Sequence, residues 1–206
     1  MSDAALLMQK DEVTFMSRKR VKKERREKEK KKITRVILGW IFQIAVVVMF
    51  AYVLVYFFGQ TRTNIGQSMD VTLSGGDTVL LNELSYRLRS PGRGDMIAFR
   101  ANGSESGHSY IKRVIGLPGE TIQIKEGMIY INEAVYLEKK DYPVITNPGL
   151  AADPIILGKS EYFVLGDNRN NSEDSRFVDV GNVELDDIEG KIWFVISPWE
   201  HFGFVK

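Results

Sequence analysis

A nearly continuous apolar run constrains this chain more than any other feature of its sequence. Residues 36–58 read VILGWIFQIAVVVMFAYVLVYFF, and Gln43 is the only strongly polar residue among these 23. A helix needs about 20 apolar residues to cross the hydrocarbon core of a bilayer. The run is too long for the core of a cleaved signal peptide, and it lacks the polar face of a helix on a soluble core. It therefore predicts a transmembrane helix.

The charges that flank this run predict its orientation. Residues 1–35 contain 13 Lys and Arg against 6 Asp and Glu, whereas the rest of the chain contains 15 basic and 21 acidic residues. Flanks rich in Lys and Arg stay in the cytoplasm. We therefore expect a basic cytoplasmic tail over 1–35, a membrane span over 36–58 and an extracytoplasmic domain over 59–206.

The basic run from Arg18 to Lys32 has a second interpretation, because such runs also bind nucleic acid. Its position beside a membrane span instead favours a role in topology and in contact with anionic lipid. Three glutamates interleaved with the basic residues also fit a solvated tail. We therefore expect membrane lipid as the partner of this segment, and no nucleic acid.

The region after the span has the pattern of a mainly β domain. Short runs rich in β-branched and aromatic residues alternate with Gly and Pro, as strands alternate with turns. Glu126-Gly127 between two such runs is typical of a hairpin turn. The expected strands are 78–81, 96–99, 110–115, 121–125, 128–132, 162–165 and 191–196. This spacing favours an antiparallel sandwich or a partly open barrel and gives no sign of alternating strands and helices.

Few residue types are available for catalysis. The chain has no cysteine and two histidines, which excludes disulfides and thiolate chemistry. His108 lies in a Gly/Ser-rich loop, His201 lies among aromatic residues near the C-terminus, and neither has an obvious Asp partner in the sequence. We therefore expect no metal site. Lysine is the other candidate base for a serine nucleophile.

Ser68 and Lys112 are the candidate pair. Ser68 follows the apolar run by ten residues, which suggests chemistry on membrane-bound substrates. A lysine acts as a base near neutral pH only if burial lowers its pKa. In a strand over 110–115, Lys112 would share one face with Tyr110 and Val114, and Arg113 would lie on the other. Taken alone, this pattern favours a solvated lysine whose amine extends out of the sheet.

Four sequence blocks resemble the type I signal peptidases of bacteria, which are membrane-bound endopeptidases with a Ser-Lys dyad. The blocks are GQSMDVTL at 66–73, GDTVL at 76–80, KRVIGLPGE at 112–120 and GDNRNNSEDSR at 166–176. They occur in the order of the family, and the single N-terminal span resembles its Gram-positive form. The lysine block and the last block are specific, although the last block by itself would be typical of a solvated loop.

The resemblance implies a role for each matching residue. Ser68 would attack the scissile carbonyl, and its backbone N–H would donate to the oxyanion. Lys112 would be the general base that activates Ser68 and later the deacylating water. Ser172 would hydrogen-bond the Lys112 amine, and Asp174 and Arg176 would form an ion pair that shapes the site.

The implied activity is the removal of signal peptides from secretory preproteins at the outer face of the cytoplasmic membrane, without a cofactor. The substrate would present an extended segment with small residues near the cut and add a strand to an exposed sheet edge. Aromatic side chains near the C-terminus are candidates for lipid contact, although the first two of them fit a core role equally well. They are Trp193, Phe194, Trp199, Phe202 and Phe204.

Three positions differ from residues found in the family. Val71 stands where proline is usual, which leaves the rigidity of the loop after Ser68 open. Gly66 stands where some members have a serine, so a second oxyanion donor is a backbone group or is missing. Asn170 stands in place of an aspartate, which removes one charge.

Other functions stay open at this point. Ser-Lys peptidase domains also occur in soluble, self-cleaving repressors of the DNA-damage response, and the membrane span argues against that function. A narrower role in maturing pilin-type surface proteins is compatible with Val71. Val71 and Gly66 also favour a membrane-anchored β domain that binds peptides without cleaving them. The presence of all five implied site residues argues against such a loss of activity.

Overall fold

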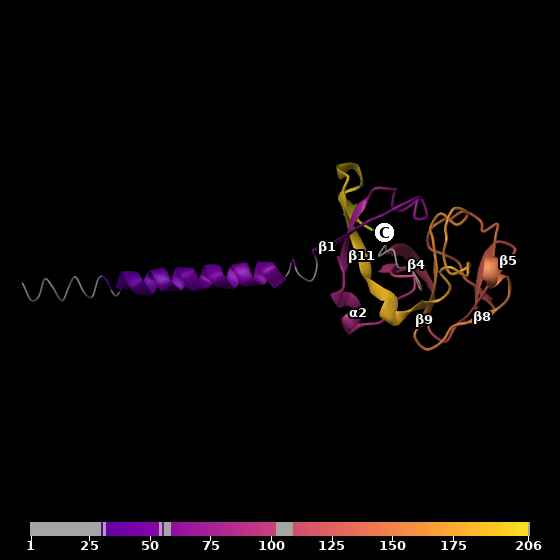
Figure 1. Cartoon of the computed structure of the whole chain (residues 1–206), viewed down its shortest axis with the longest axis horizontal. Helices are drawn as coiled ribbons and strands as arrows, with labels where there is room; N and C mark the ends of the chain where they lie inside the picture. Colours follow the sequence, from indigo (N-terminus) through magenta and orange to yellow (C-terminus); the bar gives the residue numbers. More distant parts are fainter. Residues whose placement is uncertain (1–29, 31, 54, 56–58, 102–108, 206) are drawn as a thin grey trace, which may run out of the picture. The chain divides into compact units, whose positions relative to one another are not determined.

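The computed structural model describes residues 30, 32–53, 55, 59–101 and 109–205, and Figure 1 shows the whole chain. The chain divides into two compact units, and the first ends at Val53 and the second begins at Leu54. Most of the basic run Arg18–Lys32, His108 and the outer end of the predicted span lie outside the described residues. The predicted tail, span and domain boundaries therefore stay predictions.

The first unit contains a long apolar helix. Among the described residues, Lys32–Val53 is the one helix long and apolar enough to cross a membrane, and it overlaps most of the predicted span. No residue in its most apolar stretch is buried against the rest of the protein. A helix that is apolar on every side and uncovered by protein matches the inside of a bilayer, because all its backbone groups bond within the helix.

The second unit is built from two antiparallel sheets. The larger sheet has the strand order β1-β2-β11-β3-β4-β9-β10, with β12 paired to β11. Figure 1 labels β1, β11, β4 and β9 of this sheet. Its strands are β1 (Gln60–Thr63), β2 (Thr78–Asn82), β3 (Met96–Phe99), β4 (Tyr110–Gly116), β9 (Glu161–Leu165), β10 (Val183–Glu184), β11 (Ile188–Ser197) and β12 (Gly203–Phe204).

The smaller sheet has the order β7-β6-β5-β8. Its strands are β5 (Thr121–Lys125), β6 (Met128–Ile131), β7 (Ala134–Val135) and β8 (Ile155–Ile156). The helical segments of this unit are short: α2 (Leu84–Leu88), η1 (Gly149–Ala152), η2 (Leu185–Asp187) and η3 (Trp199–His201). The predicted class, an N-terminal apolar helix followed by an antiparallel β-rich domain, is therefore confirmed.

The larger sheet is buried on both faces at its centre. In β3, Met96 and Ala98 join the core on one face, and Ile97 and Phe99 join the core on the other. Successive strand residues point to opposite faces, so a strand covered on both sides must be apolar throughout. A third core joins the smaller sheet to β4 and β9. These layers fix β4, which carries Lys112, on all sides.

Candidate active site

Ser68 lies in a turn that is anchored by its buried neighbours. Met69 and Leu73 are fully buried in the core beneath β2 and β11. The Leu73 N–H donates to the Met69 carbonyl at 2.8 Å, and the Asp70 N–H donates to the Gln67 carbonyl at 3.2 Å. Because the next residue is held in the core, the Ser68 side chain is presented at the edge of the domain.

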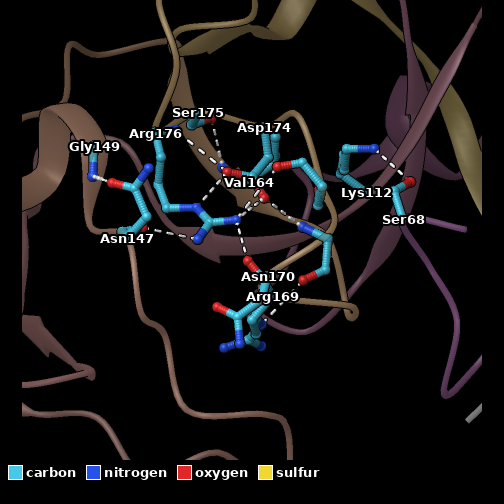
Figure 2. A network of polar contacts seen from close by, with 12 residues as sticks. Ser68, Lys112, Asn147, Gly149, Val164, Arg169, Asn170, Asp174, Ser175 and Arg176 are labelled. Atoms are coloured by element: carbon cyan, nitrogen blue, oxygen red, sulfur yellow. Dashed lines mark hydrogen bonds and ion pairs between the residues drawn. The ribbon is translucent and has the colours of Figure 1, made fainter.

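Lys112 is buried in β4 and its amine meets Ser68. Only 3% of the residue is exposed, and Lys112 Nζ lies 2.7 Å from Ser68 Oγ. Figure 2 shows the lysine side chain extended toward the serine hydroxyl. The prediction that these two residues form a pair therefore agrees with the observed geometry, whereas a solvated lysine does not.

Burial lowers the pKa of Lys112 to about 8. The loss of water around the ammonium is the main cause, because desolvation disfavours the charged form. The negative charges of Asp174 and Glu173 oppose this effect, and the positive charge of Arg176 adds to it. A substantial fraction of the amine is therefore neutral near pH 8 and able to accept the hydroxyl proton of Ser68.

Two cavities share Ser68 and Lys112 in their lining. The larger, of about 720 Å³, is also lined by Gln67, Ser172 and Glu173. The smaller, of about 240 Å³, extends between residues 109–112 at the start of β4 and the segment that leads to Ser68. Ser68 and Lys112 thus border both a larger and a smaller cavity.

The last block forms a buried ion pair behind this site. Arg176 donates to both Asp174 oxygens, with Nε–Oδ1 at 2.7 Å and Nη2–Oδ2 at 2.9 Å. Arg176 also donates to the Arg169 carbonyl at 2.6 Å and to the Asn147 carbonyl at 3.0 Å (Figure 2). The predicted Asp174–Arg176 pair is therefore present, with both side chains at most 1% exposed.

The same block also holds the backbone of Ser68. The Asn168 N–H donates to the Ser68 carbonyl at 3.0 Å, and the Asn168 side-chain amide donates to the Gln67 carbonyl at 3.0 Å. A Cβ on Gly166 would lie 2.5 Å from the Ser68 carbonyl oxygen and 2.1 Å from Ser172 Oγ. Only glycine permits this close approach, so the block and the Ser68 turn form one unit.

The predicted hydrogen bond from Ser172 to Lys112 is not formed. Ser172 Oγ is buried, and it has no hydrogen-bond partner among the described residues. The residue nevertheless lines the same cavity as Ser68 and Lys112. Its hydroxyl lies close to Gly166, where an added Cβ would be 2.1 Å from Ser172 Oγ. The structure thus corrects the contact, while the role of Ser172 stays a prediction.

A second polar network joins the turn and β4 and was missed by sequence reasoning. Arg113 donates to both Asp167 oxygens at 2.8 and 2.7 Å, and the Thr72 hydroxyl donates to Asp167 Oδ2 at 2.6 Å. Arg113 is the neighbour of Lys112 on the opposite face of the strand. Two features of the sequence could have indicated this network. Arg113 alternates with Lys112 along the strand, and Thr72, Arg113 and Asp167 all lie in family-like blocks.

Val71 adopts a backbone conformation that proline cannot. Its φ is +90°, and its side chain is 56% exposed. Proline fixes φ near −65°, so the backbone at position 71 could not keep this conformation with proline in place of valine. A β-branched residue at positive φ is a steric outlier and costs about 1–3 kcal/mol. The strained backbone at Val71 therefore depends on contacts from the surrounding structure.

Asn170 uses the amide group that distinguishes it from aspartate. Its Oδ1 accepts from the Thr146 N–H at 3.0 Å and from the Thr146 hydroxyl at 2.9 Å. Its Nδ2 donates to the Val144 carbonyl at 3.0 Å. A carboxylate would lack this donor and face the carbonyl oxygen instead. Compared with aspartate, Asn170 lacks a negative charge but gains the hydrogen bond to Val144, in the segment before η1.

His201 and the C-terminal aromatic residues lie away from the Ser68 cavities. His201 Nδ1 lies 2.8 Å from Asp77 Oδ1, a partner that the sequence did not reveal, and this contact raises the pKa of His201. Trp199 is 80% exposed, and its ring stacks on Phe202 at 4.8 Å between centroids. Trp199, Phe202 and Phe204 thus form an exposed aromatic group on η3 and β12, whereas Trp193 and Phe194 of β11 are partly buried.

Comparisons with known proteins agree with this architecture. The family model of signal peptidase, peptidase S26, matches residues 37–199. The chain is similar to signal peptidase IB of Staphylococcus aureus strain MRSA252, with 32% identity over 183 residues that cover 82% of this chain and 93% of the relative. It is also similar to signal peptidase I T of Bacillus subtilis strain 168, with 36% identity over 187 residues, 87% of this chain and 95% of the relative.

Among solved structures, the chain is similar to the crystal structure of a signal peptidase I from Enterococcus faecalis V583. The identity is 30% and the TM-score is 0.39, over 50% of this chain and 97% of that one. The match to the family model and the two sequence relatives carry the assignment. The chain therefore belongs to the signal peptidase family, peptidase S26. Membership in this family makes it a serine peptidase.

Proposed function

We propose that the protein is a membrane-anchored signal peptidase in which Ser68 is the nucleophile and Lys112 is the general base. The observation that carries this proposal is the 2.7 Å contact between a buried lysine amine and a serine hydroxyl that borders two cavities. The substrates are secretory preproteins, whose signal peptides are cut at the outer face of the cytoplasmic membrane.

The reaction proceeds by acyl transfer. The neutral Lys112 amine takes the Ser68 proton as Oγ attacks the scissile carbonyl, and the resulting ammonium then protonates the leaving amine. Lys112 afterwards takes a proton from the water that hydrolyses the Ser68 ester. No described residue accepts a hydrogen bond from the Ser68 N–H, so this group is available to the oxyanion. With Gly66 in place of a serine, a second donor has to come from the backbone.

The surroundings of the dyad support an extended peptide as substrate. β1 is an edge strand of the larger sheet, and it leads directly into the segment that carries Ser68. An extended peptide can add to such an edge through main-chain hydrogen bonds. The narrow cavity of about 240 Å³ next to Ser68 suits a small side chain near the cut.

The remaining blocks support the dyad. The Asp174–Arg176 pair shapes the wall behind Lys112, and Ser172 completes the lining of the larger cavity. The apolar helix anchors the chain with its N-terminus in the cytoplasm, and the exposed aromatic residues around Trp199 rest on membrane lipid.

The proposal is tested by incubating a detergent-solubilised preprotein with the full chain and with the Ser68→Ala and Lys112→Ala variants. We expect the wild type to cut at the end of the signal peptide and both variants to be inactive while folded. Equal cleavage by all three proteins would refute the proposed dyad. Mass spectrometry of the mature product locates the cut.

A further inference from the structure

A lysine outside the four family-like blocks contacts the turn that follows Ser68. Lys140 Nζ donates to the Val71 carbonyl at 3.1 Å and to Thr72 Oγ1 at 2.9 Å. Lys140 lies in the connection between β7 and η1, far along the chain from the turn. It lines a separate cavity beside the smaller sheet and neither of the cavities that hold Ser68. Lys140 therefore contacts the turn that carries Ser68 and not the Ser68 side chain itself.

The turn needs such a contact because its own sequence does not favour its conformation. Val71 combines a β-branched side chain with a φ of +90°, and more than half of that side chain is exposed. Strained backbone of this kind persists only where the surrounding structure holds it. Packing does not hold the Val71 side chain, whereas Lys140 holds its carbonyl through a charge-assisted hydrogen bond.

Through Thr72, the contact of Lys140 extends to the strand that carries the base. The Thr72 hydroxyl accepts from Lys140 and donates its single proton to Asp167 at 2.6 Å. Asp167 is bound on its other side by Arg113, the residue after Lys112 in β4. Lys140 thus adds a contact at the turn end of the chain of polar contacts that joins the Ser68 turn to the Lys112 strand.

The segment around Lys140 is itself fixed. Glu138 binds Arg169 through two contacts of 2.5 and 2.6 Å, and Arg169 lies 4.3 Å above the Tyr142 ring. Lys140 Nζ lies 6.0 Å from the centre of the same ring. Residues on both sides of Lys140 are therefore anchored to the last block. The Lys140 side chain is exposed, and these anchored neighbours place its amine at the turn.

We propose that Lys140 is a positioning residue for the nucleophile, a role that rests on the function proposed above. It holds the turn in the strained conformation that keeps Ser68 Oγ at the Lys112 amine. It does not touch the substrate, so its loss affects the chemical step and not substrate binding. The neighbouring Lys139 is exposed and makes no hydrogen bond or ion pair with a described residue, which provides a matched control.

The test measures kcat and KM for preprotein cleavage by the full chain in detergent. The variants are Lys140→Met, Lys140→Arg, Lys139→Met and Ser68→Ala. We expect Lys140→Met to lower kcat about tenfold, the effect of losing a hydrogen bond to a charged group, with KM and the unfolding temperature unchanged. Lys140→Arg should retain most of kcat, and Lys139→Met should behave as the wild type.

A second comparison uses Val71→Gly, because glycine adopts a positive φ without strain. In that background the loss in kcat caused by Lys140→Met should shrink to less than half of its wild-type value. Equal kcat for Lys140→Met and Lys139→Met, with Ser68→Ala inactive, would overturn the role of Lys140 alone. A loss that tracks the unfolding temperature and is not rescued by arginine would also overturn it. An active Ser68→Ala variant would overturn both proposals.

Discussion

At the residue scale, the burial of Lys112 destabilises the folded protein and lowers the pKa of the amine. The ammonium form is disfavoured because the side chain is enclosed by β4 and its neighbours. The resulting fall of its pKa from 10.5 to about 8 corresponds to about 3 kcal/mol. This cost falls on the folded protein below pH 8. In the proposed mechanism, the lowered pKa is what lets the amine act as the base for Ser68.

Lys112→Met should therefore raise the free energy of unfolding by up to about 3 kcal/mol at pH 7 while it removes activity. The sign follows from proton binding. Between pH 8 and 10.5 the unfolded wild type binds more protons than the folded one, so its stability rises with pH. The advantage of the methionine variant should shrink over this range in denaturant titrations. A variant that is less stable than the wild type at pH 7 would contradict the assigned burial cost.

Sequence reasoning found the site residues that lie within specific blocks and missed those that act across the fold. Ser68, Lys112, Asp174 and Arg176 could be named because each stands in a family-like block. Lys140 and Tyr142 stand in no block, and their contacts arise only when the smaller sheet packs beside β9. The free hydroxyl of Ser172 and the positive φ of Val71 are likewise results of packing that no local pattern encodes.

At the element scale, the strands rich in apolar residues were predictable and the short or polar ones were not. The seven expected strands correspond to β2, β3, β4, β5, β6, β9 and β11, with ends that differ by at most a few residues. β7, β8, β10 and β12 have two residues each, too few to show a period of two. β1 reads QTRT and has no apolar residue, so only its pairing with β2 makes it a strand.

The junction between β9 and the last block sets how closely that block approaches Ser68. Gly166→Ala should destabilise the protein by about 1–3 kcal/mol, because its Cβ would overlap Ser172 Oγ and the Ser68 carbonyl oxygen. Activity should fall further than the loss of stability explains, since the nucleophile is displaced. Gly92→Ala is the control, because the nearest atom to its Cβ would lie at 3.7 Å. Equal activity of the two variants, measured by preprotein cleavage, would exclude this coupling.

At the scale of the whole molecule, the proposed orientation follows from charge. The basic residues gather before the apolar helix, and acidic residues predominate after it. The topology can be tested cleanly because the chain has no cysteine of its own. A single cysteine then reports the location of one position and nothing else.

In intact cells, a membrane-impermeant maleimide should label Lys159→Cys, an exposed position before β9. It should label Ser17→Cys in the basic tail only after the membrane is opened with detergent. Labelling is read as a mass shift on a gel. The reverse pattern would place the β domain in the cytoplasm and refute the proposed site of cleavage.

The most direct measurement of the central claim is the pH dependence of kcat/KM for preprotein cleavage. A neutral Lys112 is the active form, so kcat/KM should rise with pH, pass its midpoint near 8 and level off above it. Lys112→Met should be inactive at every pH. A rate that is independent of pH between 6 and 10, or that falls through this range, would contradict a mechanism in which buried Lys112 activates Ser68.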